Sequence, residues 1–160
     1  MLAEFATWIS TTSLSETFKN VSWLVPLSQS IHILSIAAVL SAYLFLCARA
    51  LGVFAANQSM LTLERRFLPW VWYGLLLLLV TGCLQIIAEP ERSITNPFFQ
   101  YKMLALLVVI VITLPLRRKI AEVGANDTPG PIVTAPLLAI FGLLLFIIFC
   151  GRWIAYSAYS

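Results

Sequence analysis

The chain of 160 residues is long enough for one domain, and 61% of its residues are apolar. Its mean hydropathy of +0.94 lies far above the range of soluble globular proteins, so the composition excludes a water-soluble fold and indicates an integral membrane protein. The net charge of +3 is small, and the basic residues cluster beside the apolar segments, where membrane topology alone would place them. The charge therefore predicts contact with a lipid bilayer and no nucleic-acid partner.

Residues 1–22 precede the first apolar segment. They carry acidic residues and one lysine around a Ser/Thr-rich middle, which is not the pattern of a removable signal peptide. Phe5, Trp8 and Ile9 recur at helical spacing, which suits a short helix lying in the membrane interface. We therefore expect an N-terminal interfacial segment, followed by a transmembrane domain over residues 23–156.

Four segments within that domain have the length and composition of membrane spans. A spanning helix needs roughly 20 mainly apolar residues. Runs such as "GLLLLLVTG" and "LLVVIVITL" lack the alternation of a barrel strand. The sequence predicts an all-α fold, an integral membrane four-helix bundle with a short N-terminal interfacial helix. The expected spans are residues 23–48, 67–88, 98–116 and 132–156.

The distribution of arginine and lysine predicts the orientation. The loop after the first span carries Arg49, Arg65 and Arg66, and "RRK" at residues 117–119 follows the third. Short loops rich in these residues stay in the cytoplasm. We expect a multi-pass protein of a bacterial inner membrane with both termini in the periplasm.

The first span carries a polar stripe that includes the only histidine of the chain. Ser28, Gln29, His32 and Ser35 recur at spacings of three and four, which predicts one shared helix face. At a rise of about 1.5 Å per residue, His32 lies on the order of 12 Å below the outer end of its span, too deep to extend into the headgroups. A neutral imidazole that bonds to a neighbouring side chain or helix and a cofactor ligand both fit this pattern.

Polar residues in the other spans fall in the same outer half, because successive helices alternate in direction. In the second span Thr81, Gln85 and Glu89 recur every four residues, which places them on one helix face. Gly74 on the same side allows a close helix approach. Some of these groups lie close enough to span ends to reach the headgroups or to pair with one another. With His32 and Gln29 they form the candidate cofactor-binding set: Gln85, Glu89, Lys102, Arg152 and Tyr156.

The sequence lacks the motifs of several common metal-binding, hydrolytic and nucleotide-binding sites. A single histidine does not supply the three protein ligands of a catalytic zinc site, and the three cysteines lie in different spans without CxxC spacing. The sequence has no GxSxG, P-loop or dinucleotide-binding motif. No catalytic residue is assigned, and His32 is a metal ligand only if a haem is bound.

Three stretches of the chain resemble a known superfamily. The strings "IHILSIAAVLSAYLFLCARALGVF", "LERRFLPWVWYGLLLLLVTG" and "NPFFQYKMLALLVVIVITLPLRR" are similar to small four-span bacterial membrane proteins of the copper-resistance D type superfamily. Within it, the chain most resembles a family of unknown function with an LPWxWxG signature, which falls on residues 68–74. More distantly it resembles four-helix, haem-containing protoporphyrinogen oxidases, which implies functional roles for His32 and Lys102. The ExxH often found around that histidine begins here with Gln29, so an amide replaces the carboxylate that would orient the ring.

Two functions follow from these observations, and the sequence does not decide whether any reaction is catalysed. The first is a non-catalytic membrane subunit or anchor that assembles with a partner, either as a homo-oligomer or with a membrane or periplasmic protein. The second is a redox or cofactor-binding protein that holds a b-type haem, a porphyrin or a quinone near His32 in the periplasmic half.

Overall fold

The computed structural model describes residues 2–123 and 129–156 and forms seven helices from them, with no strand in those ranges. Four of the helices are long and apolar enough to cross a membrane. The predicted all-α membrane bundle is confirmed. The helices are α1 (Leu2–Ser10), α2 (Ser13–Asn20), α3 (Leu24–Ala50), α4 (Met60–Ala88), α5 (Pro90–Ile94), α6 (Pro97–Glu122) and α7 (Pro131–Tyr156).

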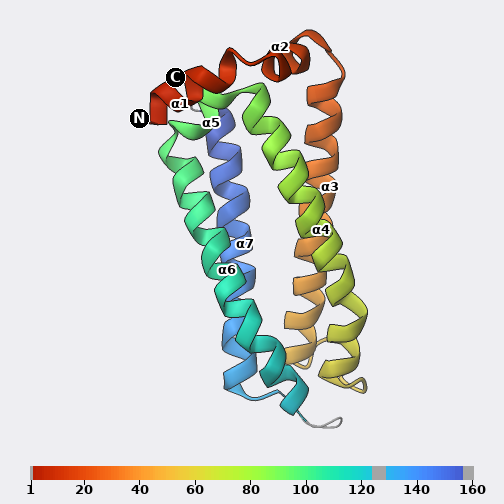
Figure 1. The fold of residues 1–160 in the computed structure, drawn as a ribbon. Coiled ribbons are helices and arrows are strands. Elements are labelled where there is room, and N and C mark those ends of the chain that lie inside the picture. Colours follow the sequence, from red (N-terminus) through yellow and green to blue (C-terminus); the bar gives the residue numbers. More distant parts are fainter. Residues whose placement is uncertain (1, 124–128, 157–160) are drawn as a thin grey trace.

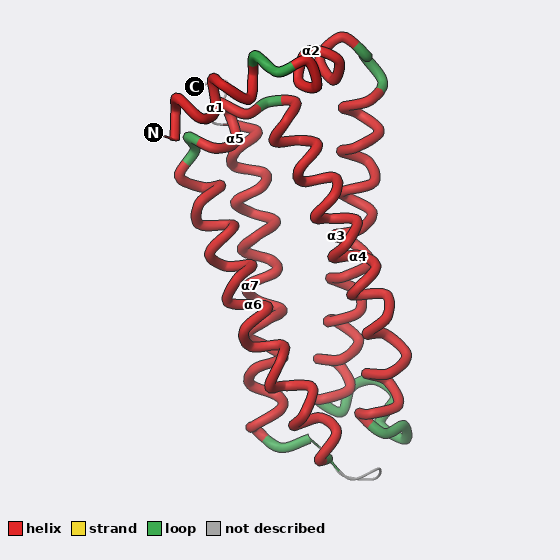
Figure 2. Tube along the Cα trace, in the orientation of Figure 1, coloured by secondary structure: helices red, strands yellow, loops and turns green. Residues whose placement is uncertain are grey.

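The four long helices form two antiparallel hairpins, α3–α4 and α6–α7 (Figure 1, Figure 2). The hairpins meet mainly through α3 and α7, whereas α4 and α6 touch little. Helices α1, α2 and α5 lie across one end of the bundle together with both chain ends, and we call it the terminal end (Figure 1). The opposite end holds the 51–59 loop and the charged end of α6, and we call it the basic end.

Polar side chains determine where α4 and α6 begin. The hydroxyl of Ser59 accepts a hydrogen bond from the backbone N–H of Thr62 at 3.1 Å, and the side-chain Oδ1 of Asn96 accepts one from the backbone N–H of Phe98 at 2.9 Å. These bonds satisfy N–H groups that the first helical turn leaves without partners. Pro97 then occupies the start of α6, where the missing proline N–H removes no helical bond.

Helices α4 and α6 reach further toward the basic end than hydropathy predicted. The expected spans were 67–88 and 98–116, whereas the helices begin at Met60 and end at Glu122. Hydropathy falls at the first charged residues, but arginine, lysine and glutamate are good helix formers, so the helical hydrogen bonding continues. The charged residues of these turns are therefore fixed on helices and not in loops.

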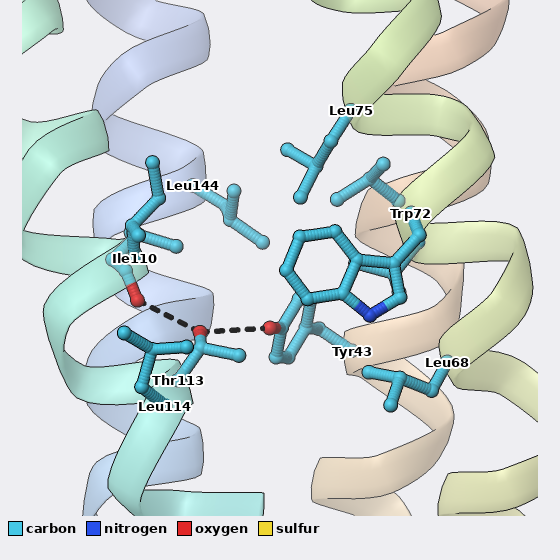
Figure 3. Close-up of a pocket in the computed structure, with 11 residues that line it drawn as sticks. Tyr43, Leu68, Trp72, Leu75, Ile110, Thr113, Leu114 and Leu144 are labelled. Carbon is cyan, nitrogen blue, oxygen red and sulfur yellow. Dashed lines mark hydrogen bonds between the residues drawn. The ribbon is translucent and has the colours of Figure 1, made fainter.

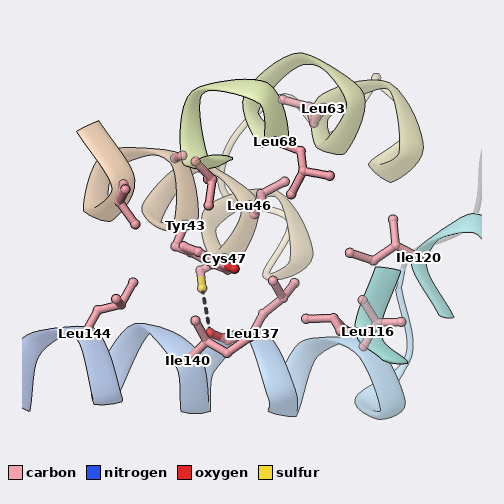
Figure 4. Packing of buried hydrophobic residues seen from close by; sticks show 14 of the residues in the cluster. Tyr43, Leu46, Cys47, Leu63, Leu68, Leu116, Ile120, Leu137, Ile140 and Leu144 are labelled. Atoms are coloured by element: carbon pink, nitrogen blue, oxygen red, sulfur yellow. Dashed lines mark hydrogen bonds between the residues drawn. The ribbon is translucent and has the colours of Figure 1, made fainter. Parts of the chain in front are cut away.

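The buried apolar core lies between the hairpins, toward the basic end (Figure 4). Leu137 and Ile140 of α7 are fully buried, and the Cys47 thiol donates to the Leu137 carbonyl at 3.4 Å. Lipid tails are as apolar as leucine, so this packing stabilises the bundle through van der Waals contact. All three cysteines are free thiols.

Gly74 marks the closest approach of α4 to α3. A Cβ atom at this position would lie 2.6 Å from Cγ2 of Val39 and 3.5 Å from the Ser35 carbonyl oxygen. The first distance is shorter than any ordinary carbon contact, so only glycine fits here without a shift of Val39. The predicted close approach at Gly74 is confirmed.

The N-terminal segment forms two short helices where the sequence predicted one. Thr12 separates them, because its hydroxyl accepts from the Ser15 N–H at 3.4 Å and so starts α2. The rings of Phe5 and Trp8 are exposed and stack with their centroids 5.9 Å apart. An interfacial position for this segment suits those exposed rings and stays a prediction.

Candidate functional site

The candidate site lies in the terminal half of the bundle, where α3 packs against α4. Ser28, His32 and Ser35 are buried on α3, at the spacing of three and four that defines one helix face. The Ser28 hydroxyl donates to the backbone carbonyl of Thr81 at 3.4 Å. The polar stripe of α3 is therefore directed at α4.

The hydrogen bonds around His32 locate its ring proton. The side chain is 8% exposed, and its Nδ1 lies 2.7 Å from Oγ1 of Thr81. That hydroxyl has one proton, which it donates to the Leu77 carbonyl at 2.6 Å. The hydroxyl must therefore accept from His32, so Nδ1 carries a proton. In the neutral ring Nε2 then keeps its lone pair, and in the part of the chain that the structure describes Nε2 has no hydrogen-bond partner.

The second hairpin adds a cation to this half of the bundle. Lys102 of α6 is partly buried and lies in the terminal half of the bundle, as His32 does. Within residues 2–123 and 129–156, Lys102 forms no hydrogen bond or ion pair. Gly82 lies beside the imidazole, since a Cβ there would be 3.7 Å from Cε1 of His32. The arrangement offers one nitrogen lone pair and one ammonium group.

Gln29 does not share the buried face of α3, and its predicted place beside His32 is corrected. The side chain is exposed, while Ser28 and His32 are buried. Adjacent helical residues differ by about 100° around the axis, so a position next to Ser28 turns away from α4. The buried face of α3 therefore includes three of the four predicted residues, Ser28, His32 and Ser35.

The remaining predicted residues pair locally near the terminal end. Glu89 forms an ion pair with Arg92. The Arg152 guanidinium donates to the Tyr156 hydroxyl at 3.3 Å, and its Cζ lies 4.9 Å from the centre of that ring. Gln85 is half-buried on α4. Lys102 thus shares the terminal half of the bundle with His32, whereas Arg152 and Tyr156 bond to each other.

A second set of buried charges lies at the basic end and was missed from the sequence. Glu64 of α4 is 6% exposed, and its carboxylate accepts from Nε of Arg117 on α6 at 3.3 Å. Arg49 is 2% exposed, and its Nε donates to the Gln58 carbonyl at 2.7 Å. Helical spacing could have indicated that Glu64 is buried, because Glu64 precedes the buried Leu68 by four residues and so shares its face of α4.

A narrow slot between α4 and α6 separates these two regions (Figure 3). At its side, the Tyr43 hydroxyl lies 3.1 Å from that of Thr113, which donates its own proton to the Val109 carbonyl at 2.7 Å. Tyr43 is therefore the donor and links α3 to α6. The slot volume is about 20 Å³, so it is a seam between packed helices.

The sequence matches one family over nearly its whole length. The model described as a family of unknown function (DUF6644) matches residues 5–157. No curated protein and no solved structure matches the chain. The predicted resemblance to a family of unknown function agrees with this match, whereas kinship with the copper-resistance D superfamily and with haem-containing oxidases stays a prediction. Because the match covers all four spans, the chain belongs to the family of unknown function DUF6644.

Proposed function

We propose that this protein is a non-catalytic membrane subunit or anchor that assembles with a partner through the outer surface of its helices. The supporting observation is a row of small residues on the exposed face of α7: Ala135, Ala139 and Gly142. A Cβ at Gly142 would meet no atom within 4 Å. In a bilayer such small-residue rows let two helices approach closely, which is how membrane helices associate.

Helix α3 carries a similar surface. Ala37, Ala38 and Ser41 are exposed, and so is Gln29 nearer the terminal end. Among the residues that the structure describes, the Gln29 amide has no hydrogen-bond partner. An amide within a span is stabilised when it bonds to a polar group of another helix. A partner helix on this face would supply that group.

The localisation that goes with this role is a bacterial inner membrane with both termini in the periplasm. Its support is the charge distribution, since arginines 49, 65, 66, 117 and 118 all belong to the basic end. Both termini lie at the other end.

The test enlarges one small residue on the proposed surface. Gly142→Leu is expected to reduce the size of the detergent-purified assembly, measured by light scattering on a gel-filtration column. Val111→Leu is the matched control, because Val111 is an exposed residue of α6 and the change also enlarges an outward side chain. Unchanged assembly in Gly142→Leu, or equal loss in both variants, would count against the proposal.

The geometry of His32 favours a second candidate, a cofactor-binding protein. A ligating histidine donates its other ring N–H to a neighbouring group, and the Nδ1 bond to Thr81 is of this kind. The free Nε2 lone pair would be the axial ligand of a b-type haem or a hydrogen-bond acceptor for a quinone, and Lys102 would pair with an acidic group. A bound haem would supply one-electron chemistry.

The visible spectrum of purified protein decides this candidate. Cells supplied with a haem precursor are expected to yield protein with a Soret band or with a co-purified porphyrin or quinone. His32→Ala is expected to lose the ligand with the helices still folded, and Lys102→Ala to lose less of it. A colourless, ligand-free preparation would leave His32 as a structural link between α3 and α4.

A further inference from the structure

A cavity of about 460 Å³ opens at the basic end, beside the slot between α4 and α6. Residues 64–73 of α4 supply most of its wall, and α6 supplies a single arginine. Leu68 and Trp72 line both this cavity and the slot, so the cavity continues toward the hydrocarbon region. Its lining includes Glu64, Arg65, Pro69, Trp72, Tyr73 and Arg117.

The charged groups of the cavity leave one net positive charge. Glu64 is buried and paired with Nε of Arg117. Arg117 has further N–H donors, and across the described ranges no partner occupies them. Arg65 is exposed and adds a second guanidinium. Two arginines and one carboxylate match the single negative charge of a phosphodiester, the group to which guanidinium forks bind best.

The rest of the lining is suited to the lipid that carries such a group. Trp72 and Tyr73 are large exposed aromatic side chains that extend the wall toward the membrane interior. Pro69 has no N–H, so the carbonyl of Arg65 lacks its usual helical donor and can accept from a headgroup hydroxyl. The cavity thus combines two arginines, the Arg65 carbonyl as an acceptor, and an aromatic wall formed by Trp72 and Tyr73.

We propose that this cavity binds one anionic phospholipid, with its phosphodiester on Arg65 and Arg117 and an acyl chain against Trp72. Basic pockets between membrane helices bind the headgroups of anionic lipids. The site lies at the other end of the bundle from His32 and is independent of assembly through α7.

The test is a lipid titration of the delipidated, detergent-solubilised protein, followed by native mass spectrometry. Phosphatidylglycerol is expected to form a one-to-one adduct at lower concentration than phosphatidylcholine. Arg65→Gln is expected to weaken that adduct about five-fold, the equivalent of about 1 kcal/mol. Arg66→Gln is the matched control, because Arg66 is exposed and adjacent but does not line the cavity, and its effect is expected to stay below two-fold.

A second pair of variants tests the acyl chain. Trp72→Ala is expected to weaken the adduct, and Trp70→Ala, an exposed tryptophan outside the cavity, is expected to leave it unchanged. Inorganic phosphate in excess is expected not to displace the lipid, because it lacks the chain. Equal binding of the two lipids, equal effects of Arg65→Gln and Arg66→Gln, or displacement by phosphate would each overturn the proposal.

Discussion

The bond between the His32 and Thr81 side chains joins α3 to α4 in the terminal half of the bundle. Its direction is fixed, because the threonine proton goes to Leu77 and the imidazole must donate. Polar contacts between membrane helices contribute modestly, about 0.6 kcal/mol on average and up to about 1.7. A buried donor that loses its acceptor is expected to cost more than that average.

Thr81→Val keeps the shape of the side chain and removes the acceptor of the His32 proton. We expect the free energy of unfolding to fall by about 1 kcal/mol. The measurement is denaturant unfolding in detergent micelles. Thr17→Val is the control, because Thr17 is exposed and its hydroxyl bonds only within α2. Equal stability of the two variants would show that the imidazole bond contributes nothing.

Gly74→Ala tests the close approach of α4 to α3. The added methyl group would overlap Val39, whose branched side chain is stiff, so we expect a loss of about 1–3 kcal/mol in unfolding free energy. Val39→Ala removes the overlapping atom and should recover part of that loss in the double variant. Gly151→Ala, which meets nothing within 4 Å, should not destabilise. Strictly additive effects at positions 74 and 39 would contradict the contact.

At the scale of single residues, the sequence was enough to select His32 as a buried polar residue, but not to predict which group it bonds. A histidine in an apolar run is visible without a structure, and helical spacing placed it with Ser28 and Ser35. Its acceptor, Thr81, lies 49 residues away, and which atom it bonds depends on how two helices rotate against each other. The same dependence on rotation explains why Gln29 was misplaced and Glu64 overlooked.

At the scale of the helices, an ion pair and a hydrogen bond join the two hairpins across the side where α4 and α6 contact each other little. The Glu64–Arg117 ion pair links these helices at the basic end, and the Tyr43–Thr113 bond links α3 to α6 nearby. Hydropathy could place the spans because it measures transfer into lipid. It could not place the added charged turns, because helix formation continues in the headgroup region after hydropathy has fallen.

Arg117→Gln is expected to destabilise the bundle more than Glu64→Gln. The first change leaves a buried carboxylate without its cation, whereas the second leaves a half-exposed arginine that water can solvate. We expect a loss of about 1–3 kcal/mol for Arg117→Gln and less than about 0.5 for the exposed neighbour Arg118→Gln, measured by unfolding in micelles. Equal losses at positions 117 and 118 would contradict a stabilising ion pair.

At the scale of the whole molecule, an even number of spans puts both termini at one end, and six of the ten arginine and lysine residues belong to the other. The sequence predicted this arrangement because it depends only on counting spans and charges. How the hairpins meet, through α3 and α7, could not be predicted, since all four helices carry nearly uniform apolar surfaces.

Thiol labelling tests the orientation in a variant that lacks the native cysteines. Glu16→Cys, on exposed α2, is expected to react with a membrane-impermeant maleimide in intact spheroplasts. Asn57→Cys, in the loop at the basic end, is expected to react only after permeabilisation. The reverse pattern would place the termini in the cytoplasm.

The central claim is that this chain functions as part of a larger membrane assembly. Its most direct test is the protein mass of the particle extracted with its own lipids from the native membrane, with the chain at its normal level. We expect a mass above the 17.8 kDa of one chain, either a multiple of that value or a sum with a second protein. A particle that contains a single 17.8 kDa chain and no other protein would contradict the claim.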